Sequence, residues 1–405
     1  MNILLATYWA IPYLGGVWPF MQQLKYGLEQ LGHTVDLFGN GTGNPKYHIV
    51  NQGRELGKEF VLPILEERLN EKAAPLLHAD YWIRFFEMER YCLELSASYF
   101  GLGHYDIIHT QDVISTLAMS RVKKKHTALV ANIHGSLARE LMLMQELNQD
   151  SNFQALPAWK YYWALEHYGA GAADVTITST HWLKNILVQD FAVPEQQFST
   201  FQYGLDADKF WSVCSKGTDV TAPYGKKVII CPARLAQIKG LHFLIPALQL
   251  LKQRRSDWVC WIAGDGEKKE ELMQQAFAVG IGEDVMFLGQ REDVPALLQQ
   301  ADIFVHPSVQ DNMPFSVMEA QISGLPAVVS NAGGLPEMVQ HEVTGLVSNV
   351  GDIDTLASHL EFLLAHDEVR ANMGAAARAW GTEHWSIDQM IERYLHVYQR
   401  AAAMH

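Results

Sequence analysis

Cysteine is scarce in this chain of 405 residues. The four cysteines, Cys92, Cys214, Cys231 and Cys260, lie far apart and form no CxxC pair. A disulfide framework is therefore excluded, and a reducing cytoplasm fits best. No apolar run approaches the roughly 18 residues that a membrane-spanning helix needs. The first residues also lack the basic segment of a signal peptide. We expect a cytoplasmic protein without integral membrane association.

Basic residues are also fewer than acidic residues. The chain has 31 Lys and Arg residues against 45 Asp and Glu residues, which gives a formal net charge of −14. Nucleic acid is excluded as the main partner, because binding to its phosphates needs a broad basic surface. Any phosphate that this protein holds must be captured locally by a few cations.

Short apolar runs alternate with amphipathic stretches along the whole chain, without internal repeats. We expect strands at 2–7, 34–38, 106–109, 128–133 and 175–179, and again at 228–231, 259–263, 285–288, 303–306 and 327–330. This alternation predicts an α/β fold of two Rossmann-like domains with parallel sheets, facing each other across a cleft. We place the first domain at 1–203 and the second at 204–385, with a last helix at 386–405 packing back on the first. Ligands of such folds bind at the carboxyl ends of the strands.

Two cations follow the first strand of the second half, in the segment ICPARLAQIKG. Arg234 and Lys239 stand five residues apart, just before a helix, and such a pair can clamp an anion. The alternative is two surface charges on a loop. After the next strand come Gly264-Asp265-Gly266, which let the backbone approach a ligand or simply form a turn. Arg291, after a third strand, is a candidate for a base pocket.

The segment PSVQDNMPFSVMEAQISGLP, residues 307–326, carries two carboxylates around a strand-to-helix turn. We expect a helix at 314–322, since Pro314 suits a first turn. Asp311 can accept hydrogen bonds from sugar hydroxyls, and Glu319, about 7 Å further along the axis, can reach ribose hydroxyls. The alternative is a helix cap at Asp311 and a surface residue at Glu319. The amides expected to point at a diphosphate are those of Met313, Phe315 and Ser316.

These residues and others in the same order resemble the retaining glycosyltransferases of family 4, which share the two-domain GT-B fold. The second half carries most of the resemblance, and the first half adds Gly15-Gly16, His109, His134-Gly135 and Tyr203-Gly204-Leu205-Asp206. The second half contributes Arg234, Lys239-Gly240, Gly264-Asp265-Gly266, Ala301-Asp302, Pro307-Ser308, Asp311, Glu319-Ala320, Gly324, Pro326, Gly333-Gly334, Pro336-Glu337 and Gly345. The family motif is Glu, seven residues, Glu, and here its first position is Asp311, one methylene shorter.

The resemblance implies a role for each matching residue. Arg234 and Lys239 would hold the diphosphate and stabilise the leaving group, and Glu319 would bind ribose. The donor sugar would be held by the Asp311 carboxylate and by the backbone from Asn312 through Met313, Pro314 and Phe315 to Ser316. Gly15 and Gly16 would let the first domain approach the phosphate and sugar, with His134 near the reaction centre.

The predicted function is transfer of a sugar, with retained anomeric configuration and no metal, from a nucleotide diphosphate sugar to an acceptor held by the first domain. UDP-glucose or UDP-N-acetylglucosamine is the favoured donor by family usage, and the acceptor is expected to be a soluble small molecule or saccharide. The open alternatives are a nucleotide-sugar 2-epimerase on the same fold and a non-catalytic sugar-nucleotide binding protein.

Three further patterns have competing readings. Asp206-Ala207-Asp208 spells the DxD metal signature of another glycosyltransferase fold, but at a domain crossover we expect Asp206 to serve a turn or helix cap. We expect residues 39–43, GNGTG, to form a surface loop rather than a nucleotide loop. An aromatic group favours core packing, with a sugar-stacking acceptor wall as the alternative: Tyr81, Trp82, Phe85, Phe86, Trp159, Tyr161, Tyr162 and Trp163.

Overall fold

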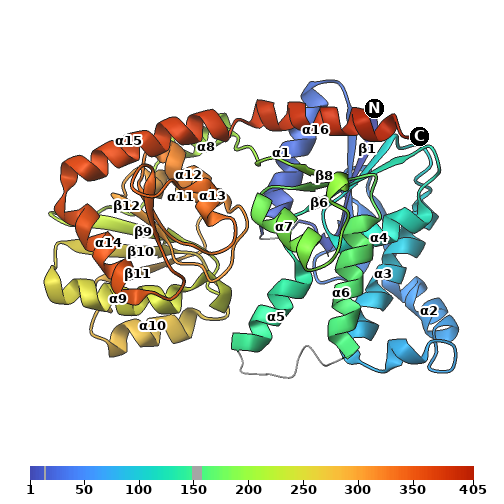
Figure 1. The fold of residues 1–405 in the computed structure, drawn as a ribbon, viewed down its shortest axis with the longest axis horizontal. Coiled ribbons are helices and arrows are strands. Elements are labelled where there is room, and N and C mark those ends of the chain that lie inside the picture. The colour runs from blue at the N-terminus through green and yellow to red at the C-terminus, as the bar shows by residue number, and fades with distance from the viewer. Residues whose placement is uncertain (13–14, 148–156) are drawn as a thin grey trace. The chain divides into compact units, whose positions relative to one another are not determined.

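The computed structural model describes residues 1–12, 15–147 and 157–405. Its contacts divide the chain into two units, Met1–Phe201 with Asp388–His405, and Gln202–Ile387 (Figure 1). Each unit is built on one largely parallel sheet with its own helices. The predicted α/β class with two Rossmann-like domains is therefore confirmed.

The sheet of the first unit has eight strands in the order β4-β3-β2-β1-β5-β6-β7-β8. All neighbouring strands from β2 to β8 are parallel. Their bounds are β1 Asn2–Ala10, β2 Thr34–Asn40, β5 Ile107–Thr110, β6 Ala128–Ile133, β7 Val175–Thr178 and β8 Phe198–Thr200. Strands β5, β6 and β7 are buried along their whole length, as continuous apolar runs of a covered parallel sheet are.

Two antiparallel strands at one edge were not predicted. β3 (Lys46–Ile49) pairs antiparallel with β2, and β4 (Arg54–Gly57) pairs antiparallel with β3. The expected loop at 39–43 was wrong in its first half, because β2 runs on to Asn40. The buried Asn40 side chain donates hydrogen bonds to the Tyr8 carbonyl oxygen at 2.6 Å and to the Tyr47 hydroxyl at 3.2 Å. These two hydrogen bonds hold the end of β2 against Tyr8 and Tyr47, which lie far from each other in the sequence.

The sheet of the second unit has six parallel strands in the order β11-β10-β9-β12-β13-β14. Strands β9 and β12 are neighbours, although two strands separate them along the chain. The chain thus builds one half of the sheet outward from β9 and the other half outward from β12. The bounds are β9 Lys227–Pro232, β10 Trp258–Ala263, β11 Val285–Gly289, β12 Ile303–His306, β13 Ala327–Ser330 and β14 Gly345–Ser348.

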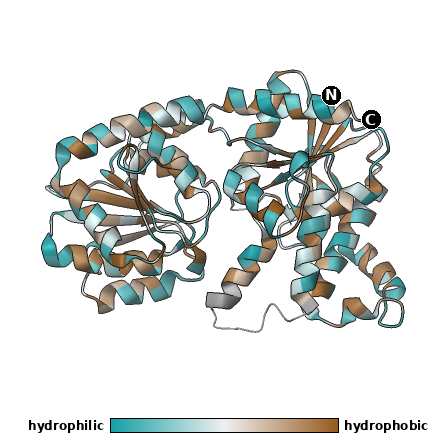
Figure 2. Ribbon diagram, viewed as in Figure 1, coloured by the Kyte–Doolittle hydropathy of each residue, from teal (hydrophilic) through white to brown (hydrophobic). Residues whose placement is uncertain are grey.

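Helices accompany both sheets, and in Figure 2 many strands are brown, whereas the helices alternate between brown and teal. The first unit has α1 Val17–Gln30, α2 Leu62–Arg68, α3 Tyr81–Phe100, α4 Val113–Val122, α5 Leu137–Leu147, α6 Pro157–Gly171 and α7 His181–Gln189. The second has α8 Ala207–Cys214, α9 Leu241–Arg254, α10 Lys269–Ala278, α11 Val294–Leu298, α12 Phe315–Ser323, α13 Leu335–Met338, α14 Ile353–Ala365 and α15 Asp367–His384.

The last helix, α16 (Ile387–Ala402), contacts the first unit through two tyrosines. Tyr394 donates its hydroxyl hydrogen to the Asn132 side-chain oxygen at 2.8 Å, and the Tyr398 hydroxyl lies 2.8 Å from His109 Nδ1. All four side chains are buried. These contacts join the end of the chain to the middle of the sheet, since Asn132 lies in β6 and His109 in β5.

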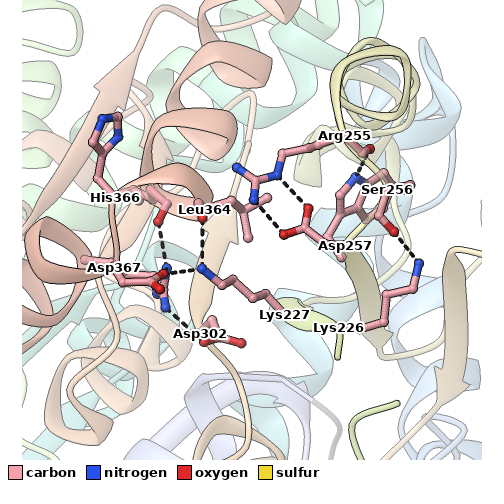
Figure 3. A network of polar contacts seen from close by, with 12 residues as sticks. Lys226, Lys227, Arg255, Ser256, Asp257, Asp302, Leu364, His366 and Asp367 are labelled. Atoms are coloured by element: carbon pink, nitrogen blue, oxygen red, sulfur yellow. Dashed lines mark hydrogen bonds and ion pairs between the residues drawn. The ribbon is translucent and has the colours of Figure 1, made fainter. Parts of the chain in front are cut away.

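Several ion pairs lie at the amino ends of the strands in the second unit (Figure 3). Lys227, the first residue of β9, donates to the Leu364 carbonyl oxygen at 2.9 Å and pairs with Asp367. Arg255 donates two hydrogen bonds to Asp257, at 2.7 and 2.6 Å. The charged groups at this edge are thus paired with one another and with carbonyl groups, away from the carboxyl ends where ligands of such sheets bind.

At the opposite, carboxyl edge, two loops touch through their backbones. Gly240 has a φ of 70°, and a Cβ added there would lie 2.0 Å from the Pro307 carbonyl oxygen. The amide of Val309 donates to the Ile238 carbonyl oxygen at 2.8 Å. The loops after β9 and β12 are therefore held together at a distance that only glycine allows at position 240.

We predict that Gly240→Ala destabilises the protein more than Gly280→Ala. Gly280 also has a left-handed φ, of 78°, but a Cβ there meets nothing within 4 Å. Gly280→Ala should cost only the conformational strain, about 1 kcal/mol, whereas Gly240→Ala should cost about 1–3 kcal/mol more for the clash. Urea unfolding of both variants measures this difference, and equal losses would show that the close approach is not rigid.

Candidate functional site in the second unit

The sheet of the second unit has its topological switch point between β9 and β12. The chain leaves β9 toward one edge of the sheet and β12 toward the other, so their following loops begin side by side at the carboxyl edge. Besides the Val309 bond, Ser308 donates its hydroxyl hydrogen to the Ile238 carbonyl oxygen at 2.9 Å. The switch point is where open α/β sheets bind ligands. Both predicted charged loops lie there.

Lys239 and Asp311 meet at this point. Lys239 Nζ lies 2.6 Å from Asp311 Oδ2, and His306 Nε2 lies 2.8 Å from the same oxygen. Because a carboxylate only accepts, Nε2 carries the hydrogen of the second contact. The side chains of His306, Asp311 and Lys239 are 2%, 13% and 21% exposed, so the cluster is largely shielded from water.

The charges in this cluster favour ionised Asp311. Burial alone would raise the pKa of this carboxyl group, but the Lys239 ammonium and the hydrogen bond from His306 outweigh it and hold the pKa well below its usual range. The other His306 nitrogen, Nδ1, is buried and, in the part of the chain that the structure describes, has no hydrogen-bond partner. The hydrogen bond that His306 donates through Nε2 therefore orients the Asp311 carboxylate.

Arg234 lies in the same loop as Lys239, and its side chain is exposed. Its neighbours are fixed by the loop after β10, because Leu235 donates its amide hydrogen to the Asp265 carbonyl oxygen at 2.9 Å. Gly264 packs as closely, since a Cβ there would lie 1.9 Å from the Ala233 carbonyl oxygen. The structure thus brings the loops of Arg234, Lys239, Gly264 and Asp311 to one edge of the sheet.

Helix α12 begins one residue later than predicted. It runs over Phe315–Ser323, and Pro314 is its N-cap, without a side-chain hydrogen bond to the helix. The alternative in which Asp311 caps this helix is therefore wrong, and Asp311 Oδ1 instead accepts from the Asn312 amide at 3.1 Å. The amides of Phe315 and Ser316 belong to the first turn, whose amides have no partner within the helix.

The start of α12 is anchored within the second unit. The Met313 sulfur accepts from the Tyr203 amide at 3.4 Å, and the Phe315 and Tyr203 rings stack with centroids 6.0 Å apart. Glu319, on the second turn, is half-buried, and burial raises its pKa to about 7. Glu319 is therefore less exposed than a typical surface carboxylate, and its contact with a ribose stays a prediction.

Arg291 makes its contacts away from the Lys239 cluster. Its guanidinium donates to Asp293 at 2.8 and 2.5 Å, to Thr218 at 3.3 Å, and pairs with Asp219. These carboxylates raise its pKa. The structure thus uses this side chain to join the loop after β11 to residues 218–219, and a contact with a base stays a prediction.

The DxD segment at 206–208 lies at the start of α8. Asp206 caps α8, accepting from the Lys209 amide at 2.8 Å, so the predicted helix cap is confirmed. Within residues 1–12, 15–147 and 157–405, no group of three or more His, Cys, Asp or Glu side chains is placed to hold a metal ion.

The site residues predicted in the first unit lie at two places on it. Gly15 and Gly16 are exposed and directly precede α1, with Gly16 at its N-cap. His134 follows β6, and its Nε2 lies 2.9 Å from the Gln111 side-chain oxygen. Burial lowers the pKa of His134 to about 3, so this imidazole is neutral near pH 7. Its place near a reaction centre stays a prediction.

Two residues that organise these loops were not predicted from the sequence. His306 ends β12 and orients Asp311, and its place at a strand end was the available signal. Glu166, in α6, accepts from the Ser136 hydroxyl and the Ala138 amide, both at 3.0 Å, and so holds the start of α5 just after His134. Nothing in the local sequence links Glu166 to a segment about thirty residues earlier, so only the fold reveals it.

The aromatic group contains buried, partly buried and exposed members. Phe86 and Tyr162 are buried and pack edge to face, 5.8 Å apart, as the core interpretation predicts. Tyr81 and Trp82, at the start of α3, are 70% and 52% exposed. Stacking of an acceptor sugar on these rings stays a prediction.

Two family models match the chain. The model described as Glycosyl transferases group 1 covers residues 218–380, and the model described as Glycosyltransferase Family 4 covers residues 14–209. Together they cover every strand of the two sheets except β1, and they include the switch-point loops. The chain belongs to the family 4 glycosyltransferases of GT-B fold, and it is a transferase.

Known proteins resemble the chain over different lengths. A glycosyltransferase of Methanocaldococcus jannaschii is 25% identical over 100% of this chain and 99% of its own. The GDP-mannose-dependent alpha-(1-6)-phosphatidylinositol monomannoside mannosyltransferase of Mycobacterium tuberculosis is 29% identical, over 56% of this chain and 61% of its own. The crystal structure of HepE of Anabaena in complex with UDP has a TM-score of 0.67 and 20% identity, covering 98% of this chain and 100% of HepE. That likeness supports the fold.

We predict that Glu166→Gln removes a pH dependence of stability. Glu166 is 1% exposed, and burial raises its pKa from 4.5 to about 7. Between these pH values the folded protein holds a proton that the unfolded chain has lost, so stability falls as the pH rises through this window. The difference between the folded and unfolded pKa of Glu166 corresponds to about 3 kcal/mol in the free energy of unfolding.

Urea unfolding at pH 4.5 and 7.5 tests this. The wild type should lose about 3 kcal/mol more than Glu166→Gln over that range, while the exposed control Glu283→Gln should behave as the wild type does. Parallel pH profiles for the wild type and Glu166→Gln would contradict the prediction.

Proposed function

We propose that this chain transfers a sugar from a UDP-sugar to a soluble acceptor, without a metal and with retention of anomeric configuration. The observation that carries the proposal is Lys239 at the switch point of the second unit, where it contacts Asp311, four residues before α12, and shares a loop with Arg234. A departing nucleoside diphosphate gains negative charge in the transition state. Preorganised cations and amides at that place stabilise the charge, and so lower the barrier.

Each part of the donor has a candidate partner. The diphosphate meets Lys239 and Arg234, and the ribose hydroxyls meet Glu319, whose half-buried carboxyl group lies on the second turn of α12. The sugar hydroxyls meet Asp311 and the backbone at Asn312. UDP is favoured by family usage and by the UDP complex of HepE, whereas the mycobacterial relative is named for GDP-mannose. UDP-glucose and UDP-N-acetylglucosamine are the proposed donors.

A soluble acceptor is favoured by the charge of the predicted first domain. Residues 1–203 contain 15 basic and 20 acidic residues, net −5. An enzyme that takes its acceptor from an anionic lipid surface gains from a basic surface instead. We therefore propose a small metabolite or a saccharide as acceptor, bound by the first unit. Within residues 1–12, 15–147 and 157–405, no helix has both the length and the hydropathy of a transmembrane segment.

Substitution of the two cations tests the donor site. Lys239→Ala and Arg234→Ala should each weaken UDP binding at least tenfold and lower kcat/KM with UDP-glucose by about 10²–10³. Lys226→Ala is the matched control, since Lys226 directly precedes β9 at the opposite edge of the sheet and donates to the Ser256 carbonyl oxygen (Figure 3). Calorimetric titration with UDP, GDP and ADP identifies the base. Unchanged nucleotide binding in both variants would contradict the site.

Retention is tested separately from binding. UDP-glucose carries an α-linked sugar, so hydrolysis or transfer with retention should release the α-anomer first. Proton NMR spectra recorded before mutarotation distinguish the two anomers. A β-anomer appearing first would contradict the proposed stereochemistry, without bearing on the donor site.

A further inference from the structure

The Lys239 ammonium already forms an ion pair in this structure, with the carboxylate of Asp311. Their atoms lie 2.6 Å apart in a largely shielded position, with Asp311 13% and Lys239 21% exposed. The proposed ligand of Lys239 is also an anion, a diphosphate. Two anions therefore compete for one ammonium group, and one of them is part of the protein.

Asp311 is held in this competing position from several sides. His306 Nε2 donates to Oδ2 at 2.8 Å, the same oxygen that Lys239 contacts, and the Asn312 amide donates to Oδ1 at 3.1 Å. The Asp311 carbonyl oxygen accepts from the Gly334 amide at 2.9 Å, which fixes the backbone. The side chain is an aspartate, and its short stem leaves little freedom to swing away.

We propose that Asp311 masks Lys239 and that donor binding replaces this ion pair, so that the site favours a complete nucleotide sugar over the bare nucleoside diphosphate. The inference rests on the proposed function, since it assigns the diphosphate to Lys239. A diphosphate that takes Lys239 leaves the Asp311 carboxylate partly buried and short of one partner, which costs binding energy.

A nucleotide sugar offsets that cost and a nucleoside diphosphate does not. Hydroxyl groups of the donor sugar can donate to the Asp311 oxygen that Lys239 has released, while His306 keeps the carboxylate in place. After the sugar has been transferred, the hydroxyl donors are gone, and Asp311 regains Lys239 from the nucleoside diphosphate. The pair thus couples recognition of the sugar to the hold on the phosphate, and it promotes release of the product. His306 acts as a positioning residue in this exchange.

A double-mutant cycle tests the proposal by titration calorimetry at fixed ionic strength, with UDP and UDP-glucose as probes and GDP and GDP-mannose as a second pair. Asp311→Asn should bind UDP at least tenfold more tightly than the wild type, because the amide no longer neutralises Lys239. Its preference for UDP-glucose over UDP should fall by a similar factor. In the Lys239→Ala background, Asp311→Asn should leave UDP binding nearly unchanged, since the masked cation is absent. Asp311→Ala, as a second variant, should behave as Asp311→Asn does.

The matched control is Asp257→Asn. Asp257 is a partly exposed carboxylate at the opposite edge of the sheet, and it pairs with Arg255 at 2.6 Å, so this variant removes the same charge without freeing Lys239. It should change UDP affinity less than threefold. An equal gain in Asp257→Asn, or a gain from Asp311→Asn that persists without Lys239, would overturn the proposal in favour of a general effect of net charge.

The remaining outcomes separate this inference from the proposed function. Unchanged UDP binding in Asp311→Asn, together with weakened binding in Lys239→Ala, would overturn the masking and leave the donor site intact. Unchanged binding in Lys239→Ala, or no binding of either nucleotide by the wild type, would contradict the donor site itself.

Discussion

The hydrogen bonds to the Ile238 carbonyl oxygen, from Val309 and Ser308, hold together two loops that belong to opposite halves of one sheet. Strand β9 continues toward β10 and β11, and strand β12 continues toward β13 and β14, so the loops after β9 and β12 are neighbours only at their origin. The short contact at Gly240 keeps them there. The meeting of Lys239 with Asp311, and hence the candidate site, depends on this constraint.

The chain is acidic overall. Its candidate anion site therefore depends on a few cations in one loop and not on a broad basic surface. At the amino edge of the second sheet, cations such as Lys227 and Arg255 are neutralised by carboxylates in positions that support the fold. At the carboxyl edge, Lys239 is neutralised by a carboxylate that the proposed ligand can replace. Ion pairs of similar geometry thus have different consequences, because only the second pair lies where the switch point and the first turn of α12 offer further partners to a phosphate.

Much of this arrangement could be predicted from the sequence, because buried parallel strands are continuous apolar runs. The strands Ala128–Ile133, Ile303–His306 and Ala327–Ser330 were predicted at their observed bounds. The edge strands β3 and β4 were missed, since they are short and lack such runs. Local patterns also predicted that Lys239 and Asp311 lie at the same edge of the sheet. They did not predict the contact between the two side chains. The ion pair, the role of His306 and the cap from Glu166 depend on contacts between distant segments, and one sequence does not encode those contacts in a readable pattern.

The proposed donor site requires that the switch point between β9 and β12 bind the diphosphate of the nucleotide sugar. A crystal structure of the protein with UDP-glucose is the decisive test. We expect phosphate oxygens within hydrogen-bond distance of Lys239 Nζ and the Arg234 guanidinium, with the Lys239–Asp311 pair separated and His306 still bound to Asp311. A diphosphate bound elsewhere, with that ion pair intact, would contradict it.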